Sequence, residues 1–178
     1  MAVVLGIDPG SRVTGFGVIE HATATTAYVT SGCIRATLSH SAENRLNEIY
    51  SGLMELIDQY QPDHIAIERI FMARSAESAL KLGQARGVAL LAAARHSIPL
   101  FEYEAKKVKQ AVVGSGAATK AQVQRMVQVL LSLEGMPQED AADALAIALC
   151  HTQTMGNLHR LGATKGRFRK GRLVEPEV

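Results

Sequence analysis

The sequence predicts an α/β fold in which a mixed five-stranded sheet is flanked by helices on both faces. Three observations lead to this prediction. Three strand-like segments stand close together near the N-terminus, helical and strand-like segments then alternate, and helical segments follow up to about residue 150. Short connections favour antiparallel strands, whereas alternation of helix and strand favours parallel ones.

The first three strands come from short apolar segments separated by turn residues. Val3–Ile7 is almost continuously apolar, as expected of a strand that is covered on both faces. It ends in Asp8-Pro9-Gly10-Ser11, which is a strong turn signal. Gly15–Glu20 and Tyr28–Ile34 follow as the second and third strands. We therefore expect an antiparallel meander.

The rest of the chain alternates between helical and strand patterns. Apolar residues recur at helical spacing over Asn44–Tyr60, and Gln61-Pro62-Asp63 ends that helix. His64–Glu68 is another buried strand, and it finishes in a carboxylate. The later elements are a long alanine-rich helix, a short strand and three further helices, over Ser75–His96, Leu100–Tyr103, Glu104–Val113, Thr119–Leu131 and from Pro137 through Leu149.

Length and composition are those of one soluble domain. The chain has 178 residues, 47% of them apolar and 20% charged. No apolar run reaches the roughly 20 residues that span a bilayer, and the first residues show no signal-peptide pattern. Cys33 and Cys150 lack metal-ligand spacing, so we expect two buried free thiols in a cytoplasmic protein.

Charge divides the chain into residues 1–155, expected to form the folded domain, and a basic tail, 156–178. The tail holds six basic and two acidic residues, which gives +4, and the rest therefore carries −2 of the total of +2. A basic tail suits a polyanionic partner, but it is equally typical of a solubilising segment. We expect the tail to be disordered in the free protein.

Two carboxylates follow buried strands. Asp8 comes directly after the first strand, and Glu68 ends the fourth. Ligands of open α/β sheets bind outside the carboxyl ends of strands, so both side chains would point into one crevice if these strands were parallel neighbours. Two unpaired carboxylates there would repel and raise each other's pKa, and a divalent cation would remove that cost.

Two further carboxylates lie on the last predicted helix. Asp140 and Asp143 are three residues apart and project from one face, among small residues that would let the helix approach the sheet. Structural explanations exist for part of the set. Asp140 could favour the helix dipole, and Asp8 could form a turn. Glu68 and Asp143 are harder to explain in that way.

Carboxylates without His or Cys ligands select Mg²⁺ or Mn²⁺. Two such ions about 4 Å apart can activate a water and stabilise the leaving oxygen of a phosphoryl displacement. The hypothesis is that Asp8 bridges two ions while Glu68, Asp140 and Asp143 complete their shells, as in a phosphodiesterase.

Several stretches resemble the RuvC family of bacterial Holliday junction resolvases, in the ribonuclease H-like superfamily. They cover roughly residues 3–150: 6–15 (GIDPGSRVTG), 66–68 (AIE), 78–87 (SALKLGQARG), 108–110 (VKQ) and 140–146 (DAADALA). The resemblance implies a ribonuclease H-like fold. It also implies a homodimer that binds a four-way DNA junction, makes two symmetric nicks in recombination and repair, and works with the branch-migration motor RuvA–RuvB.

The family's four acidic ligands fall on Asp8, Glu68, Asp140 and Asp143. The resemblance also makes Phe71 a DNA-binding aromatic and Lys109 and Lys120 phosphate or active-site contacts. Arg12, Arg69 and Arg74 flank the strand-end acids and could touch backbone phosphates. Ala79, Gly83 and Gly87 form a stripe on the long helix that suits either a dimer seam or packing on the sheet. None of the histidines has ligand spacing, although His151 could approach the site.

Three other functions share parts of this pattern. An ATP-using phosphotransferase of the actin-like group also carries an Asp-x-Gly turn after a strand, but it needs two lobes around the nucleotide. A junction-binding module without catalysis would not need the acidic set. A ribonuclease that acts on RNA–DNA hybrids shares the chemistry, and only a comparison of substrates separates it.

Overall fold

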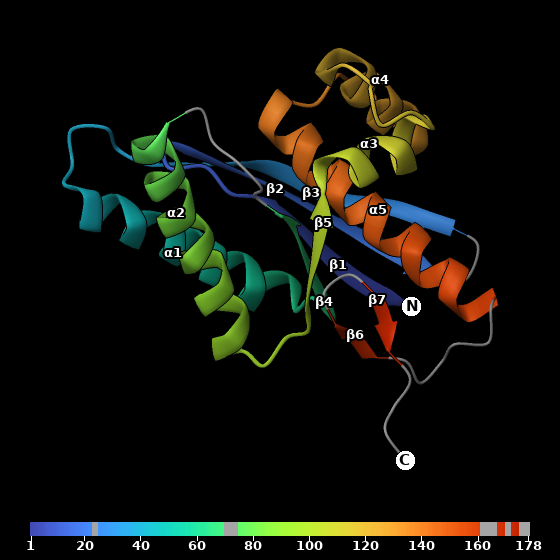
Figure 1. Ribbon diagram of the computed structural model, residues 1–178, viewed down its shortest axis with the longest axis horizontal. Coiled ribbons are helices and arrows are strands. Elements are labelled where there is room, and N and C mark those ends of the chain that lie inside the picture. Colours follow the sequence, from blue (N-terminus) through green and yellow to red (C-terminus); the bar gives the residue numbers. More distant parts are fainter. Residues whose placement is uncertain (23–24, 70–74, 161–166, 170–171, 175–178) are drawn as a thin grey trace.

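The computed structural model describes residues 1–22, 25–69, 75–160, 167–169 and 172–174, with side chains up to residue 156. One five-stranded sheet crosses the molecule in the order β3-β2-β1-β4-β5 (Figure 1). β1 and β2 pair antiparallel, as do β2 and β3, whereas β4 is parallel to both β1 and β5. The predicted mixed sheet is confirmed.

The strands follow the predicted segments and extend one to three residues beyond them at one or both ends. They are β1 (Ala2–Asp8), β2 (Val13–Ala22), β3 (Thr25–Arg35), β4 (His64–Arg69) and β5 (Leu100–Glu104). β1 and β4 lie in the middle of the sheet and have buried residues on both faces, which explains why they read as almost continuous apolar runs. β3 is an edge strand, and most of it is exposed or half-buried.

The helices also match the predicted segments, with shifts at their ends. They are α1 (Ala42–Tyr60), α2 (Ala76–Arg95), α3 (Ala105–Val113), α4 (Lys120–Leu130) and α5 (Glu139–Arg160). Thr119 caps α4 by accepting a hydrogen bond from the Gln122 amide. The last helix begins at Glu139, two residues after Pro137. None of the described helices is long and apolar enough to cross a membrane.

Two layers of helices cover the two faces of the sheet (Figure 1). α1 and α2 pack on one face, where Ile49, Leu53 and Ile57 meet Ile7 and Ile67. α5 lies across the other face, with α3 and α4 packed on it, and its residues from Leu145 to Cys150 are all buried there. Alternation along β1 and β4 therefore turns Ile7 and Ile67 toward α1 and α2, and turns their neighbours toward α5.

Glycines let α5 lie directly on the sheet. A Cβ at Gly6 would overlap the carbonyl oxygen of Ala144, and a Cβ at Gly15 would overlap that of Asp140. At Gly17 it would meet the Leu145 side chain at 2.6 Å. Glycine in a strand often marks such a close backbone approach. The small residues of α5 allow close packing as predicted, and the glycines of β1 and β2 provide the matching space.

The two cysteines differ in how deeply they are buried. Cys150 is buried, but Cys33 is half-buried and donates to Gln138 at 3.4 Å, because it lies on the edge strand β3. The expectation of two buried thiols was therefore wrong for Cys33.

The boundary expected at residue 155 falls inside α5, and residues beyond it form the short antiparallel pair β6 (Arg167–Arg169) and β7 (Arg172–Val174). The disordered tail stays a prediction.

Candidate active site

Asp8 and Glu68 lie at neighbouring strand ends and face the same helix. β1 and β4 run parallel with Ile7 opposite Ile67, so the next residues of the two strands are Asp8 and Glu68. Because Ile7 and Ile67 point toward α1 and α2, these carboxylates point toward α5. The strands are parallel neighbours, which was the condition for a shared crevice.

Asp140 and Asp143 reach the same place from the first two turns of α5. The backbone of Asp140 lies against Gly15, and Gly15 is paired with Asp8 in the sheet. The start of α5 is therefore fixed over the end of β1. All four acids are half-buried, and each reaches the site from a backbone position that close packing determines.

The charges of the four acids act on one another. Burial raises the pKa of Asp8 to about 8, and the negative charges of Glu68, Asp143 and Asp140 contribute in that order. Burial also raises the pKa of Glu68, with Asp143 as the next cause. The pKa of Asp143 is raised by burial as well, despite the opposing effect of a nearby lysine. The cluster thus holds more negative charge than its surroundings compensate.

Lys120 is the cation nearest to this cluster. Its ammonium donates to Glu139 at 2.6 Å and lies 3.3 Å from a carboxylate oxygen of Asp143. The hydrogen bond that Lys120 donates to Glu139, followed by the charge of Asp143, raises the pKa of Lys120, so it stays protonated. Lys109 on α3 lowers the pKa of Glu68 through its charge. Both lysines predicted to assist the site therefore act on its acids.

The donor set suits a hard divalent cation, although its side chains are not arranged as a coordination shell. Among the described residues, no three His, Cys, Asp or Glu side chains are placed to hold one ion. Like charges favour separation of the acids, and Lys120 is drawn to Asp143. The backbone brings four carboxylates together at the carboxyl ends of β1 and β4. The uncompensated charge on Asp8 is the kind that a divalent cation offsets.

The other predicted contacts have different outcomes. Arg69 is the last residue of β4 and is exposed, next to Glu68. Phe71 and Arg74 lie outside the described residues.

Sequence reasoning missed Glu139, the partner of Lys120, because an acidic residue in the first turn of a helix is common. Gly15 and Gly17 were a usable signal, since two glycines inside a strand indicate close approach of another element.

His151 does not approach the carboxylates. It lies about two turns further along α5, fully buried, where its Nδ1 is 2.7 Å from the Tyr103 hydroxyl and its Nε2 is 3.0 Å from Nδ1 of His64. His64 begins β4, whereas Glu68 lies near its end. The expectation that His151 could approach the site was wrong, because the helix carries it over the other end of that strand.

A mixed sheet in this order, with carboxylates at adjacent strand ends and on the covering helix, defines a nuclease of the ribonuclease H-like class. The family described as "Crossover junction endodeoxyribonuclease RuvC" matches residues 4–151. The chain belongs to this RuvC family.

Relatives and solved structures agree with this assignment. The crossover junction endodeoxyribonuclease RuvC of Saccharophagus degradans is 58% identical over 98% of this chain and 100% of its own length. That of Photorhabdus laumondii is 57% identical over 97% and 99%. The structure of Thermus thermophilus RuvC in complex with a Holliday junction substrate is 34% identical, with a TM-score of 0.83 over 88% of this chain and 96% of that one.

Proposed function

We propose that this protein is a Mg²⁺-dependent endonuclease that resolves four-way (Holliday) DNA junctions by paired symmetric nicks, in homologous recombination and DNA repair. The observation that carries the proposal is the meeting of Asp8, Glu68, Asp140 and Asp143 at one sheet edge, with the pKa of Asp8 raised to about 8 by burial and by the other three acids. Membership of the RuvC family supports the choice of a branched DNA substrate.

The four carboxylates would hold two Mg²⁺ ions, for which Mn²⁺ could substitute. Asp8, at the centre of the repulsion, would be the central ligand of the set, and Glu68, Asp140 and Asp143 would supply the other carboxylate oxygens. Bound there, the ions would supply an activated water and charge stabilisation at the leaving oxygen. The protein itself would hold these oxygens close together, and cation binding would offset the electrostatic repulsion between them.

The lysines would act on the phosphate rather than on the metals. Glu139 holds the Lys120 ammonium beside Asp143 and keeps it protonated, so a positive charge stands where a phosphodiester would approach the acids. Lys109 provides a second charge near Glu68. We propose Arg69 and Arg74 as further phosphate contacts and Phe71 as an aromatic that stacks on an unpaired base at the branch point.

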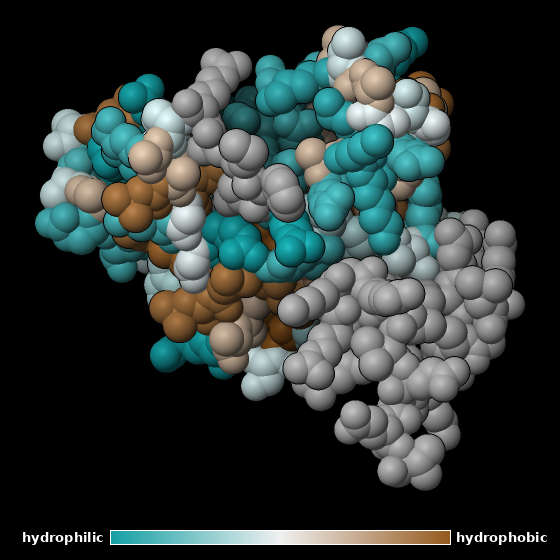
Figure 2. Space-filling model, viewed as in Figure 1, coloured by the Kyte–Doolittle hydropathy of each residue, from teal (hydrophilic) through white to brown (hydrophobic). Residues whose placement is uncertain are grey.

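We also propose that the protein works as a homodimer joined through the outer face of α2. Gly83 and Gly87 have no atom within 4 Å of an added Cβ, so these small residues are not used for packing on the protein's own sheet. Leu80 and Leu91 on the same helix are 64% and 60% exposed. Figure 2 shows apolar surface over α2. A seam there would give two sites for two nicks, and gel filtration with light scattering tests it.

Family resemblance adds two wider proposals. The protein would act in the cytoplasm, where chromosomal junctions form, and together with the branch-migration motor RuvA–RuvB. Co-purification of the three proteins on an immobilised four-way junction would test the second, with a linear duplex of equal length as the control.

The deciding experiment is cleavage of a labelled synthetic four-way junction in Mg²⁺. Linear duplex, RNA–DNA hybrid and chelator-treated samples serve as controls. We expect paired nicks in strands of like polarity, confined to the junction and lost with the chelator. Cleavage of the hybrid in preference to the junction would instead identify a hybrid-specific ribonuclease, and binding without cleavage would reduce the protein to a junction-binding module.

A further inference from the structure

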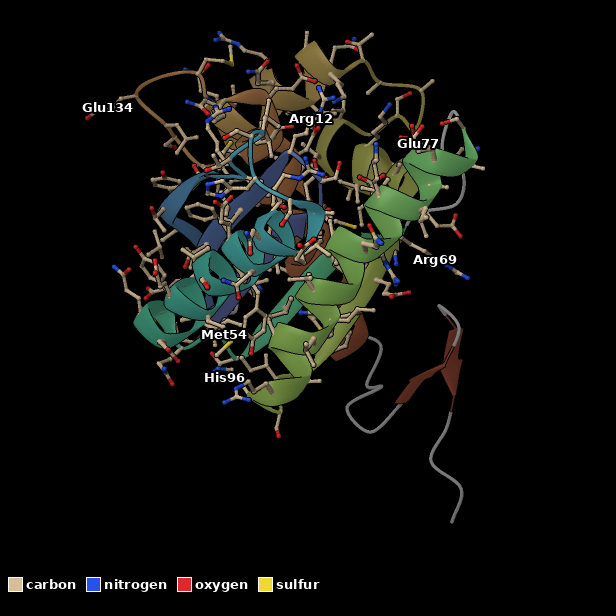
Figure 3. The ribbon with its side chains drawn as sticks, turned by 90° about the vertical axis from the view of Figure 1, so that its left-hand side faces the viewer. Arg12, Met54, Arg69, Glu77, His96 and Glu134 are labelled. Atoms are coloured by element: carbon tan, nitrogen blue, oxygen red, sulfur yellow. The ribbon has the colours of Figure 1, made fainter. Side chains whose placement is uncertain are left out.

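A groove beside the carboxylates takes its walls from four separate parts of the chain. Its polar lining comes from the turn between β1 and β2, from α1, from α2 and from α5, through Ser11, Arg12, Arg45, Ser78, Lys81 and Asp140. We call it the Arg45 groove. Figure 3 shows Arg12 at the same end of the molecule as Glu77, which stands beside Ser78 in the first turn of α2, whereas His96 lies at the opposite end.

The Arg45 groove carries more positive than negative charge. Arg12 and Arg45 form no ion pair with any residue that the structure describes. Lys81 pairs with Glu77 at 2.5 Å, but the two side chains are 49% and 75% exposed, and such a surface pair is easily exchanged for another partner. Asp140 is the acid in the wall, and it belongs to the set that takes cations.

The turn that carries Arg12 is held in one conformation relative to the carboxylates. The buried Thr14 hydroxyl donates to the Gly10 carbonyl at 3.0 Å and accepts from the Gly10 amide at 3.3 Å. A Cβ at Gly10 would overlap the carbonyl oxygen of Val13. Because this turn follows directly from Asp8, Arg12 stands at a fixed position beside the site.

We propose that the Arg45 groove binds the sugar–phosphate backbone of the strand that is cut, at phosphates next to the one held by the carboxylates. The inference rests on the proposed nuclease function. Asp140 lies in both the groove and the carboxylate cluster, so a strand seated at the acids continues into the groove. Apart from Asp140, its polar lining consists of cations and hydroxyls, and no aromatic ring is present among the described residues that line it, which suits phosphate oxygens rather than bases.

The groove therefore fixes the register of the strand without reading its sequence. Arg45 is half-buried on α1, and a guanidinium can bind two phosphate oxygens at once. Lys81 can leave Glu77 for a phosphate without exposing any buried charge. Loss of these cations would weaken binding equally for all sequences and leave the chemistry at the acids intact.

The first test measures junction affinity over a salt series for the double variant Arg45→Ala/Lys81→Ala. Binding is followed in Ca²⁺, with each sample checked for cleavage on a denaturing gel. We expect affinity to fall roughly 10-fold or more at 0.1 M salt, and the slope of log K against log salt to become shallower by about 1.5 for each protomer on the junction, because each protomer loses two phosphate contacts.

Two further variants make the result specific. Arg95→Ala removes an exposed cation from the last turn of α2, outside the groove, and should leave the slope unchanged. Arg45→Lys keeps the charge and should preserve most of the slope. An unchanged slope in the double variant, or an equal loss in Arg95→Ala, would overturn the proposal. Thermal melting of each variant shows whether it is folded.

A second test locates the phosphate. Single methylphosphonates, which are uncharged, are placed at each of three phosphates on either side of the cut. Neutralising the phosphate in the groove should weaken binding of the parent but not of the double variant, and the other positions should act on both proteins alike. Equal effects at every position would refute a groove contact. If the parent does not cut the junction at all, the nuclease proposal fails instead, so the two failures are distinguishable.

Discussion

Two clusters of polar side chains lie under the same helix, α5, about two turns apart, and they differ in how their needs are met. At the start of α5, four carboxylates stand together, and burial, followed by the charges of the other three, raises the pKa of Asp8 to about 8. Further along, His151, Tyr103 and His64 satisfy one another through hydrogen bonds of 2.7 and 3.0 Å. The first cluster therefore contains uncompensated negative charge, and the second contains none.

This difference separates a site for a ligand from a piece of the core. Burial lowers the pKa of His151 to about 3, so the ring stays neutral and donates and accepts within the protein. Phe101 packs on it with 4.5 Å between ring centroids. Nothing outside the chain is needed there. Among the residues that the structure describes, the carboxylates have too few such partners, since Lys120 is shared between Asp143 and Glu139. Added positive charge would compensate them.

The largest expected effect comes from removing one charge of the acidic cluster. Asp8→Asn keeps the shape of the side chain but loses an oxygen donor that carries full negative charge. We expect junction cleavage to fall by at least about 10³-fold, as for the loss of a group that acts only in the transition state. Junction binding should be retained. The measurement is single-turnover cleavage beside binding, and cleavage within tenfold of the parent would refute the central role of Asp8.

The next effect tests how the acids are brought together. Gly15→Ala would push a Cβ into the Asp140 carbonyl, so α5 has to move away from β2. We expect a loss of about 2–4 kcal/mol of unfolding free energy from overpacking, and cleavage at least about tenfold slower because both aspartates shift. Chemical denaturation and cleavage rates measure the two effects.

Gly156→Ala is the matched control, because it lies in α5 with no atom within 4 Å of the added Cβ. This substitution should be neutral or stabilising by up to about 1 kcal/mol. If Gly15→Ala behaved like this control, the close approach of α5 to β2 would not be what places the aspartates.

The third effect is the contribution of Asp8 to the dependence of stability on pH. The pKa of Asp8 rises from 3.8 to about 8 on folding, so the folded protein binds the proton more tightly than the unfolded chain. Stability is then greatest below pH 4 as far as this group is concerned, and it is lost as pH rises through 8. In chelator, we expect this contribution to lower the unfolding free energy by about 1–3 kcal/mol between pH 5 and pH 8, a value reduced from full linkage because Asp8 is partly exposed.

Saturating Mg²⁺ should abolish that decline, because the cation stabilises the ionised acids. Asp8→Asn in chelator should also flatten it and be more stable than the parent at pH 8. Urea denaturation at several pH values measures both. A metal-free parent whose unfolding free energy changes between pH 5 and pH 8 in the same way as that of Asp8→Asn would show that the cluster is not under charge strain.

Sequence patterns predicted the acids better than they predicted the histidines. Asp8 and Glu68 follow buried strands, and the strand pattern is local, so their place at the sheet edge could be anticipated. Asp140 and Asp143 were recognisable as a helical pair. His151 has partners 48 and 87 residues away, on β5 and β4. No local pattern indicates contacts that depend on how α5 crosses the sheet.

The position at which α5 crosses the sheet could be predicted only in part from the sequence. Small residues on α5 predicted a close approach, but the glycines that receive it lie on β1 and β2. Which helix faces which strand depends on the order of the sheet, and that order is set by pairing between segments distant in the chain. For the same reason Cys33 was expected to be buried, although its strand lies at the edge.

The smallest expected effect lies in the histidine cluster, and it sharpens the contrast with the acids. Tyr103→Phe removes the hydroxyl 2.7 Å from His151 Nδ1 and leaves a buried ring nitrogen without that partner. We expect a loss of about 1–3 kcal/mol of unfolding free energy, with cleavage per folded molecule unchanged. The control is Tyr28→Phe, whose hydroxyl meets Ser31 at 3.2 Å on a 40% exposed residue, where the change should stay within about 0.5 kcal/mol. A cleavage defect in Tyr103→Phe at full folding would show that the two clusters are coupled, either through α5 or through the β4–β5 pairing that places Tyr103 opposite Glu68. An effect on stability alone would establish that the histidine cluster under α5 is structural, whereas the acidic cluster under the same helix needs a bound cation to balance its charge.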